Sequence, residues 1–310
     1  MNTSKKVFSR IGLALVAGYL AMIGVGSVFL VQLVNAVGLE KLAETLGPSL
    51  TILLTYVPNV AFLLVFWLVI RTIPRSEWQG EQMSFRSMSQ VFVMMYVVSL
   101  ALNLIGQAVS KAAPAGGTEA LDLINEVVTS GLPIGILMSV LFAPVVEELV
   151  FRKLMLDRIR NCGEKTAIVF SALCFGLFHG NLTQFLYAFS VGLFLGYVYC
   201  KTGKVLYTII MHALLNLLSS SIMLLLPALG RDEVGLVLIP IALVVVFLSV
   251  SGLVQLIRHL KRRDLHLDNS METCIPKGEV LKTVYLNPCV MLFVLCYSAS
   301  IVMDLLKISL

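Results

Sequence analysis

Charged residues are scarce in this sequence. Among its 310 residues, Lys and Arg together number 23 and Asp and Glu 18, so charged side chains make up 13% of the chain, against roughly 25% in soluble domains. Hydrophobic residues reach 58%, and the mean hydropathy is +0.92. A chain of this composition cannot cover a soluble core with polar surface. The scarcity of charge therefore excludes an ordinary soluble domain and predicts a multi-pass membrane protein.

Several motifs that define metal and redox sites are also missing. The six cysteines include no C-x-x-C pair and no histidine at a spacing suited to zinc, and the chain contains no H-E-x-x-H. We therefore expect reduced, structural cysteines rather than a zinc finger or a disulfide framework. The basic residues, which give a net charge of +5, are spread over loops between apolar runs. They form no aromatic-studded basic face, so nucleic acid is not an expected partner.

Long apolar runs define the expected architecture. Residues 11–34 are 24 residues without a charge, whereas about 20 suffice to cross a bilayer. This run is longer than the apolar core of a signal peptide, so we interpret it as a retained helix. Hydropathy predicts an all-α, polytopic membrane helical bundle with spans at 11–34, 49–70, 90–109, 132–158, 165–183, 184–200, 205–227, 234–257 and 284–306.

The distribution of basic residues predicts a cytoplasmic N-terminus. With this orientation, 19 of the 23 Lys and Arg residues fall in cytoplasmic segments, and the outer segments keep Lys41, Lys111, Arg231 and Lys307. Such an asymmetry follows the positive-inside rule. In a bacterium the protein would reside in the plasma membrane.

Three regions are expected along the chain. Residues 1–257 form a membrane-embedded body with an eight-helix core, and its most informative residues lie at about 132–227. Residues 258–283 are polar and basic, which predicts a cytoplasmic linker. Residues 284–310 add an extra C-terminal hydrophobic segment, which we expect to be a loosely attached ninth helix.

Polar residues at membrane depth are the main functional candidates, because each one is costly there unless it is paired or hydrated. The first group, Glu147, Glu148 and Arg152, follows Pro144, which is expected to kink an apolar helix. Glu148 and Arg152 are four positions apart and can pair on one helix face. Glu147 points about 100° away and has no partner at that spacing. An unpaired carboxylate at this depth suits a proton-accepting role.

The second group is centred on His179 in the following span. Gly163 marks the expected turn between the two spans and lies sixteen residues from both Glu147 and His179. At a rise of 1.5 Å per residue, both side chains would lie about 24 Å from that turn. Two antiparallel helices would therefore bring them to one level. Gly176 and Gly180 flank the histidine and would permit close helix approach.

The third group is His212 and Asn216, in the span that follows Lys204. The two residues are four positions apart and project from the same helix face. Asn216 would lie about 18 Å from Lys204, again at a middle depth. Of the four histidines in the chain, only His179 and His212 lie inside predicted spans.

Each group also has a simpler interpretation. The glutamates could be solvated at the cytoplasmic interface, His179 could be a lone interfacial histidine, and His212 with Asn216 could form a packing hydrogen bond. Ionisable residues inside membrane helices also build transporters, but that class predicts inverted repeats with broken helices, and the sequence shows no repeat.

Taken together, the three groups favour a hydrolase. A carboxylate and a histidine can hold and deprotonate a water molecule. A second histidine and an amide can donate hydrogen bonds to the oxyanion that forms when this water attacks a carbonyl. Peptide bonds are the natural target of such a set.

The three motifs resemble the CAAX prenyl endopeptidase and bacteriocin-processing (CPBP, Abi) family of intramembrane proteases. They read Glu147-Glu148-x-x-x-Arg152, Phe175-x-x-x-His179 and His212-x-x-x-Asn216, with no departure at any motif position, and they lie within about residues 140–220. The resemblance implies a glutamate-dependent endopeptidase. Glu147 would be the water-activating base helped by His179, His212 and Asn216 would form the oxyanion site, and Glu148 and Arg152 would be structural partners.

The same resemblance bears on cofactors and partners. No cofactor is required in this mechanism, although zinc held by Glu147, His179 and His212 stays open as an alternative. The expected partners are a membrane-associated or C-terminal peptide or protein substrate and the lipid bilayer. A non-catalytic membrane scaffold or bacteriocin-immunity protein is the alternative function, since family relatives also provide precedent for that role.

Overall fold

The computed structural model describes residues 3–38, 56–76, 80–112, 137–225, 231–262, 275–276 and 278–306. Every regular element in these ranges is helical, so the expected all-α class is confirmed. Some predicted features lie outside the described residues, namely Lys41, Lys307, Cys274 and most of the linker after Arg262. The five cysteines within the described ranges are free thiols.

Each predicted span has a helical counterpart within the described part of the chain. The N-terminal helix α1 (Thr3–Ile23) continues through a π-helical stretch into α2 (Val31–Val37). The next helices are α4 (Val57–Ile70) and α5 (Phe85–Ala112), followed by the helix that contains α8 (Ala143–Glu148) and α9 (Asp157–Ile159). The remaining helices are α10 (Glu164–Phe178), α11 (Leu182–Thr202), α12 (Val205–Leu225), α13 (Arg231–Arg262) and α14 (Pro288–Leu306).

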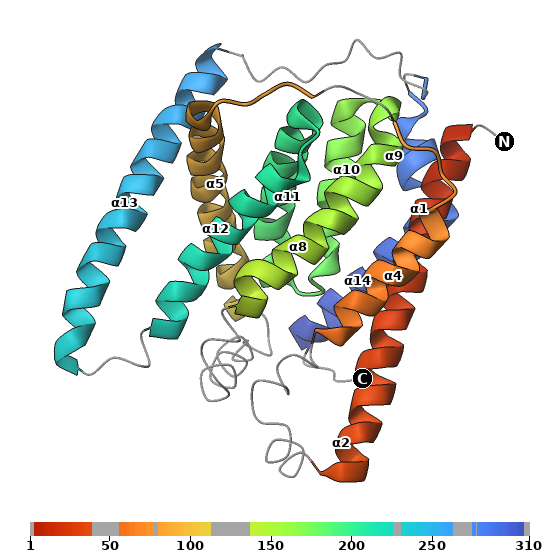
Figure 1. The fold of residues 1–310 in the computed structure, drawn as a ribbon, viewed down its shortest axis with the longest axis horizontal. Helices are drawn as coiled ribbons and strands as arrows, with labels where there is room; N and C mark the ends of the chain where they lie inside the picture. Colours follow the sequence, from red (N-terminus) through yellow and green to blue (C-terminus); the bar gives the residue numbers. More distant parts are fainter. Residues whose placement is uncertain are drawn as a thin grey trace.

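The lengths and hydropathies of these helices identify a multi-pass membrane protein. Five described stretches are long and apolar enough to cross a bilayer, and α4 and the first part of α12 are shorter apolar helices. The order across the bundle is visible in Figure 1, where α13 and α5 lie at one side, α1, α4 and α14 at the other, and α8, α10, α11 and α12 between them. The motif-bearing helices therefore occupy the centre of the bundle.

The helix that carries the two glutamates departs from regular α geometry. It is π-helical over Met138–Phe142, where the N–H of Ala143 donates to the carbonyl of Met138, and Pro144 follows in the first turn of α8. Pro144 has no N–H to donate, so the backbone pattern must change near it. The helix is π-helical again over Leu149–Leu156. Such π-helical turns are frequent at functional sites because they redirect side chains and release carbonyl groups.

Helices α10 and α11 form a tight antiparallel pair. Gly163 precedes α10 with a φ of 106°, which confirms the predicted turn. His179 ends α10, Gly180 follows with a φ of 67°, and the Asn181 side chain caps α11 by accepting from the N–H of Gln184 at 2.9 Å. A Cβ at Gly176 would lie 3.0 Å from the carbonyl oxygen of Phe185. The expected close approach at Gly176 is therefore confirmed, and the turn places His179 at the end of a short hairpin.

The C-terminal helix α14 is not loosely attached, contrary to expectation. It packs along α1, where a Cβ at Gly12 would lie only 2.6 Å from the backbone nitrogen of Val290. The Asn287 side chain donates to the Lys5 carbonyl at 3.1 Å, and Phe293 and Tyr297 are buried. The hydropathy pattern could not show this contact because it depends on two helices from opposite ends of the sequence. In the structure, α14 is an integral part of the bundle.

Helix α13 marks the opposite edge of the bundle. It packs against α5, where Gly252 lies so close to the carbonyl of Val93 that no Cβ would fit. Most of its apolar side chains are exposed, including Leu236, Leu243 and Phe247. An apolar face of this kind is stable in contact with lipid.

Candidate active site

The Glu148–Arg152 pair lies at the centre of the buried polar network. The Arg152 Nε and Glu148 Oε2 atoms are 3.1 Å apart, and both side chains are completely buried. The predicted pairing on one helix face is thus confirmed. The Arg152 guanidinium also lies over the ring of Phe175, 4.8 Å from its centroid. Its two terminal nitrogens have no hydrogen-bond partner among the described residues. Within these residues, the ion pair with Glu148 and the contact with the Phe175 ring therefore offset the cost of burying the guanidinium charge.

Glu148 also holds His212, a contact that motif spacing did not predict. The Nδ1 atom of His212 lies 3.0 Å from Glu148 Oε1, and Thr208 lies against the same carboxylate. When Nδ1 carries a proton and donates it to Glu148, the imidazole orientation is fixed. The other ring nitrogen, Nε2, then faces Glu147, whose Oε2 atom is 3.8 Å away. Glu148 therefore positions His212 as well as balancing Arg152.

His179 is positioned by its own helix and by aromatic rings. Its Nδ1 atom lies 2.9 Å from the carbonyl oxygen of Phe175, one helical turn earlier. This hydrogen bond leaves Nε2 as the nitrogen that can accept a proton. The ring stands perpendicular to those of Phe175 and Phe178, at centroid distances of 5.0 and 6.2 Å. His179 also lies within electrostatic range of Glu147, as the matched helix depths predicted.

Asn216 connects α12 to the π-helical stretch before the glutamates. Its Nδ2 group donates to the carbonyl oxygen of Ser139 at 2.9 Å. Ser139 lies within the Met138–Phe142 π-helical turn, where a carbonyl is more easily available to a side chain than in a regular α-helix. The Asn216 amide has a second N–H, which this contact leaves for another acceptor.

One pocket brings the four predicted catalytic residues together. A cavity of about 290 Å³ is lined by Glu147, His179, His212 and Asn216, among others. The Glu147 side chain is 17% exposed, whereas that of His212 is 2% exposed. Glu148 and Arg152 do not line the cavity and lie behind it. The structure thus separates residues that face the cavity from residues that support them.

Five further polar side chains line this cavity and were missed from the sequence, namely those of Tyr56, Ser139, Gln184, Tyr187 and Ser219. Tyr56 precedes α4, and Gln184 and Tyr187 lie on the first turns of α11. Both tyrosines are within electrostatic range of Glu147. Tyrosine is common near membrane interfaces for reasons unrelated to catalysis, so these tyrosines could not be identified as site residues from the sequence. The phenol groups add hydrogen-bond donors next to the carboxylate.

Phe175 is the shared support of the network. Its ring contacts Arg152 through one face, His179 at 5.0 Å and His212 at 5.7 Å between centroids, with both imidazoles perpendicular to it. The side chain is almost fully buried. The spacing of Phe175 and His179 in the second motif therefore has a packing reason, because one ring fixes both histidines.

The polar residues do not form a recognisable metal site. Among the described residues, no group of three or more His, Cys, Asp or Glu side chains is arranged to hold a metal ion. Each histidine at the cavity uses Nδ1 for a neighbouring oxygen, in one case a carboxylate and in the other a carbonyl. Such Nδ1 contacts are also the usual partners of a histidine that binds a metal through Nε2, so zinc held by Glu147, His179 and His212 stays the alternative prediction.

Comparisons with known proteins bear on the same part of the chain. Residues 129–218 match the sequence model of the type II CAAX prenyl endopeptidase Rce1-like family. This range includes all three motifs and every predicted site residue. The resemblance to the CAAX prenyl endopeptidase family is confirmed. No solved structure matches the chain significantly.

One curated relative supports the family resemblance. The chain is 25% identical over 168 residues to a Bacillus subtilis (strain 168) protein named "Putative membrane peptidase YdiL". The alignment covers 51% of this chain and 66% of that protein, just under two thirds of its length. The family match itself ends at residue 218, so α13 and α14 lie beyond it.

Proposed function

We propose that this protein is an intramembrane endopeptidase of the CAAX type that uses a glutamate-activated water molecule. The observation that carries the proposal is the single cavity lined by Glu147, His179, His212 and Asn216. The family match over residues 129–218 supports the reaction class. A cavity of about 290 Å³ lies near the lower end of the sizes typical of small-ligand pockets. It suits a scissile peptide bond and its adjoining side chains rather than a folded substrate domain.

Glu147 would act as the general base. Its side chain is 17% exposed, whereas that of Glu148 is fully buried. Its carboxylate takes a proton from water as the water oxygen bonds to the carbonyl carbon of the substrate. The carbon–nitrogen bond of the tetrahedral intermediate then breaks, and the proton passes to the leaving nitrogen. His179, whose Nε2 atom is left to accept and release a proton, assists this transfer.

His212 and Asn216 would stabilise the oxyanion. Asn216 can offer the N–H that its contact with Ser139 leaves over. His212 donates from Nε2 when it is an imidazolium, because its Nδ1 proton is held by Glu148. Preorganised donors of this kind are worth about 10²–10³-fold in rate each.

No step of the proposed mechanism passes through a metal ion, and among the described residues no group of three His, Cys, Asp or Glu side chains is arranged to hold one. The substrate would be a membrane-associated peptide or the C-terminal segment of a protein, as the family resemblance suggests.

The decisive experiment is a cleavage assay on detergent-purified protein with quenched C-terminal peptides, each in farnesylated and unmodified form. Glu147→Ala should lower the cleavage rate by about 10²–10⁴-fold, with the unfolding temperature unchanged. Glu279→Ala removes an exposed carboxylate outside the family match and is the matched control, with wild-type activity expected. Cleavage should persist in a strong chelator.

Three results would contradict the proposal. Equal cleavage by wild type and Glu147→Ala would remove Glu147 from the mechanism. Loss of cleavage with the chelator and recovery with zinc would identify a metal centre. If neither protein cleaves any peptide but Glu147→Ala retains a protective effect against a bacteriocin, the non-catalytic immunity function is correct instead.

A further inference from the structure

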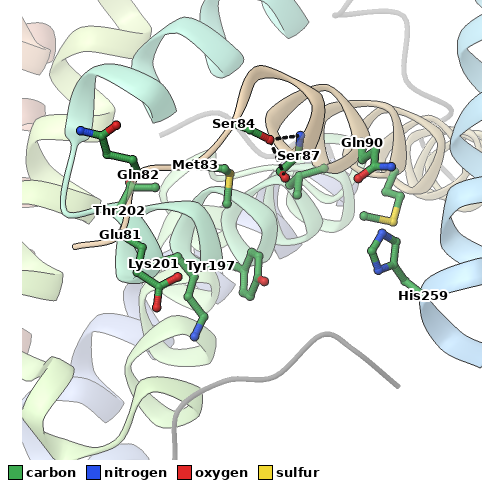
Figure 2. A pocket seen from close by; sticks show the side chains of 12 residues that line it. Glu81, Gln82, Met83, Ser84, Ser87, Gln90, Tyr197, Lys201, Thr202 and His259 are labelled. Atoms are coloured by element: carbon green, nitrogen blue, oxygen red, sulfur yellow. Dashed lines mark hydrogen bonds between the residues drawn. The ribbon is translucent and has the colours of Figure 1, made fainter. Parts of the chain in front are cut away.

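A second pocket lies at the opposite end of α11 from the candidate active site. It has a volume of about 490 Å³ and is formed by the start of α5, the end of α11 and the end of α13 (Figure 2). Tyr187 of α11 lines the first cavity and Tyr197 the second. Ten residues of helix, about 15 Å, separate these two positions. The second pocket is thus a separate feature, and no part of the proposed reaction uses it.

The pocket lies at the ends of three apolar helices. It is lined by the last turn of α11, the first turn of α5 and the last turn of α13, and each of these helices has the length and hydropathy of a membrane span. The ends of such spans coincide with the headgroup layer of a bilayer. Lipid headgroups are therefore the molecules that this pocket meets at the highest local concentration.

Backbone contacts join the segment before α5 to the end of α11. The N–H of Glu81 donates to the carbonyl oxygen of Lys201 at 2.8 Å, and a Cβ at Gly80 would clash with the carbonyl of Thr202. At the start of α5, the Ser84 hydroxyl accepts from the N–H of Ser87 at 3.1 Å. The pocket is therefore built from backbone segments that are fixed relative to each other.

Two charges of opposite sign on this wall remain available to a ligand. Glu81 and Lys201 lie next to each other in Figure 2, yet neither forms an ion pair with another residue that the structure describes. Nearby acids behave differently, because Asp157 pairs with Lys153 and Glu164 with Arg160. A neighbouring cation and anion without partners complement a ligand that carries both an anionic and a cationic group.

Apolar side chains accompany the polar ones. Met83, Met94 and the ring of Tyr197 line the interior of the pocket. Outside it, Phe85 at the start of α5 is 86% exposed and Leu260 near the end of α13 is 64% exposed. A ligand with a polar head and apolar chains would contact both the polar and the apolar side chains. A small soluble anion would contact only the polar ones.

We propose that this pocket binds the headgroup of a zwitterionic phospholipid that carries a phosphate and a primary amine. Lys201 binds the phosphate as a point charge, and Glu81 accepts hydrogen bonds from the ammonium group. The acyl chains continue along the exposed apolar side chains of α5 and α13. A choline headgroup cannot donate to Glu81 because its nitrogen has no hydrogen, so the site distinguishes phosphatidylethanolamine from phosphatidylcholine.

The test is native mass spectrometry of the full chain in detergent, titrated with phosphatidylethanolamine or phosphatidylcholine of identical acyl chains. Wild type should bind phosphatidylethanolamine about tenfold more tightly, the difference expected for one charge-assisted hydrogen bond. Glu81→Gln should remove this preference and leave phosphatidylcholine binding unchanged. Lys201→Ala should weaken the binding of both lipids about tenfold, and Lys201→Arg should restore it.

Lys204→Ala is the matched control. Lys204 is three positions from Lys201 but lies over the ring of Tyr207 and does not line the pocket, so its removal should leave lipid binding unchanged. Equal effects of Lys201→Ala and Lys204→Ala, or equal wild-type affinity for the two lipids, would overturn the proposal. Displacement of the lipid by an equal concentration of soluble glycerophosphoethanolamine would also overturn it and identify a soluble ligand. Glu147→Ala should bind lipid like wild type, which separates this result from the cleavage assay.

Discussion

The two pockets at the ends of α11 differ in how their charged side chains are paired. At the candidate active site, Glu148 and Arg152 are fully buried and paired, and the same glutamate holds His212. At the second pocket, Glu81 and Lys201 form no ion pair within the described ranges. A buried charge needs fixed partners because its desolvation is expensive, whereas a charge at the headgroup layer can remain hydrated until a ligand arrives. The buried pairs thus hold the candidate catalytic side chains in place, whereas Glu81 and Lys201 are available to bind a charged ligand.

The strongest test of this difference is the loss of a group that faces the buried cavity. His179→Ala should reduce the cleavage rate by about 10²–10⁴-fold, because it removes a proton-transfer group. The imidazole makes its hydrogen bond to the backbone of its own helix, so the variant should stay folded. Cleavage rate and thermal unfolding, measured beside Glu279→Ala, check both statements. Unchanged cleavage would mean that the cavity lined by Glu147 and His179 is not the reaction site.

Removal of Arg152 should show how strongly the buried network depends on its pairing. Arg152→Ala leaves Glu148 buried without its cationic partner and should destabilise the protein by about 3–5 kcal/mol. Lys201→Ala, at the other pocket, should change the stability by less than about 0.5 kcal/mol. The free energies of unfolding can be compared by titration with a denaturing detergent. A similar loss of stability in the two variants would show that the charged residues of the two pockets do not differ in this way.

Asn216→Ala tests the oxyanion role with a smaller expected effect. The loss of one preorganised donor should lower kcat by about 10²-fold. KM should change little, because the donor acts mainly on the charge that develops in the transition state. The variant also loses the hydrogen bond to Ser139, worth about 1 kcal/mol of stability. A raised KM with an unchanged kcat would instead assign Asn216 to substrate binding.

The smallest effect concerns the turn that carries His179. Gly180 and Gly203 have nearly identical φ angles of 67° and 66°, so alanine at either position should cost about 1–2 kcal/mol of stability. At Gly180, which directly follows His179, the new Cβ would also approach Ser300 of α14, at 3.1 Å from its hydroxyl oxygen. Gly180→Ala should therefore lower cleavage more than Gly203→Ala at equal stability. Equal cleavage rates for the two variants would show that a Cβ at Gly180 does not move His179 enough to affect catalysis.

The parts of the site that follow from helix geometry could be predicted from the sequence. Spacing of four residues placed Glu148 beside Arg152, and the equal distances from Gly163 placed Glu147 and His179 within reach of each other. These relations depend only on the rise and rotation of a helix. The same reasoning predicted the helical class and the approximate position of each span.

Relations that depend on tertiary packing could not be predicted in this way. His212 is 64 positions from Glu148, and their contact requires a particular rotation of α12 against α8. The carbonyl of Ser139 became an acceptor for Asn216 within a π-helical turn that no sequence pattern indicated. Tyr56 and Tyr187 entered the cavity from α4 and α11 as ordinary aromatic residues. The place of α14 against α1 depended on the close contact at Gly12.

The pairing of α1 with α14 also sets an order of events during biosynthesis. Lys5 and Asn287, which are joined by a hydrogen bond, are 282 positions apart in the chain. At a synthesis rate of about 5–20 residues per second, α14 leaves the ribosome roughly 14–56 s after α1. The segments bearing Glu147, His179 and His212 are therefore synthesised before α1 can pack against α14. Among the described helices α14 is the last to be synthesised, and its Ser300 lies beside the turn at Gly180.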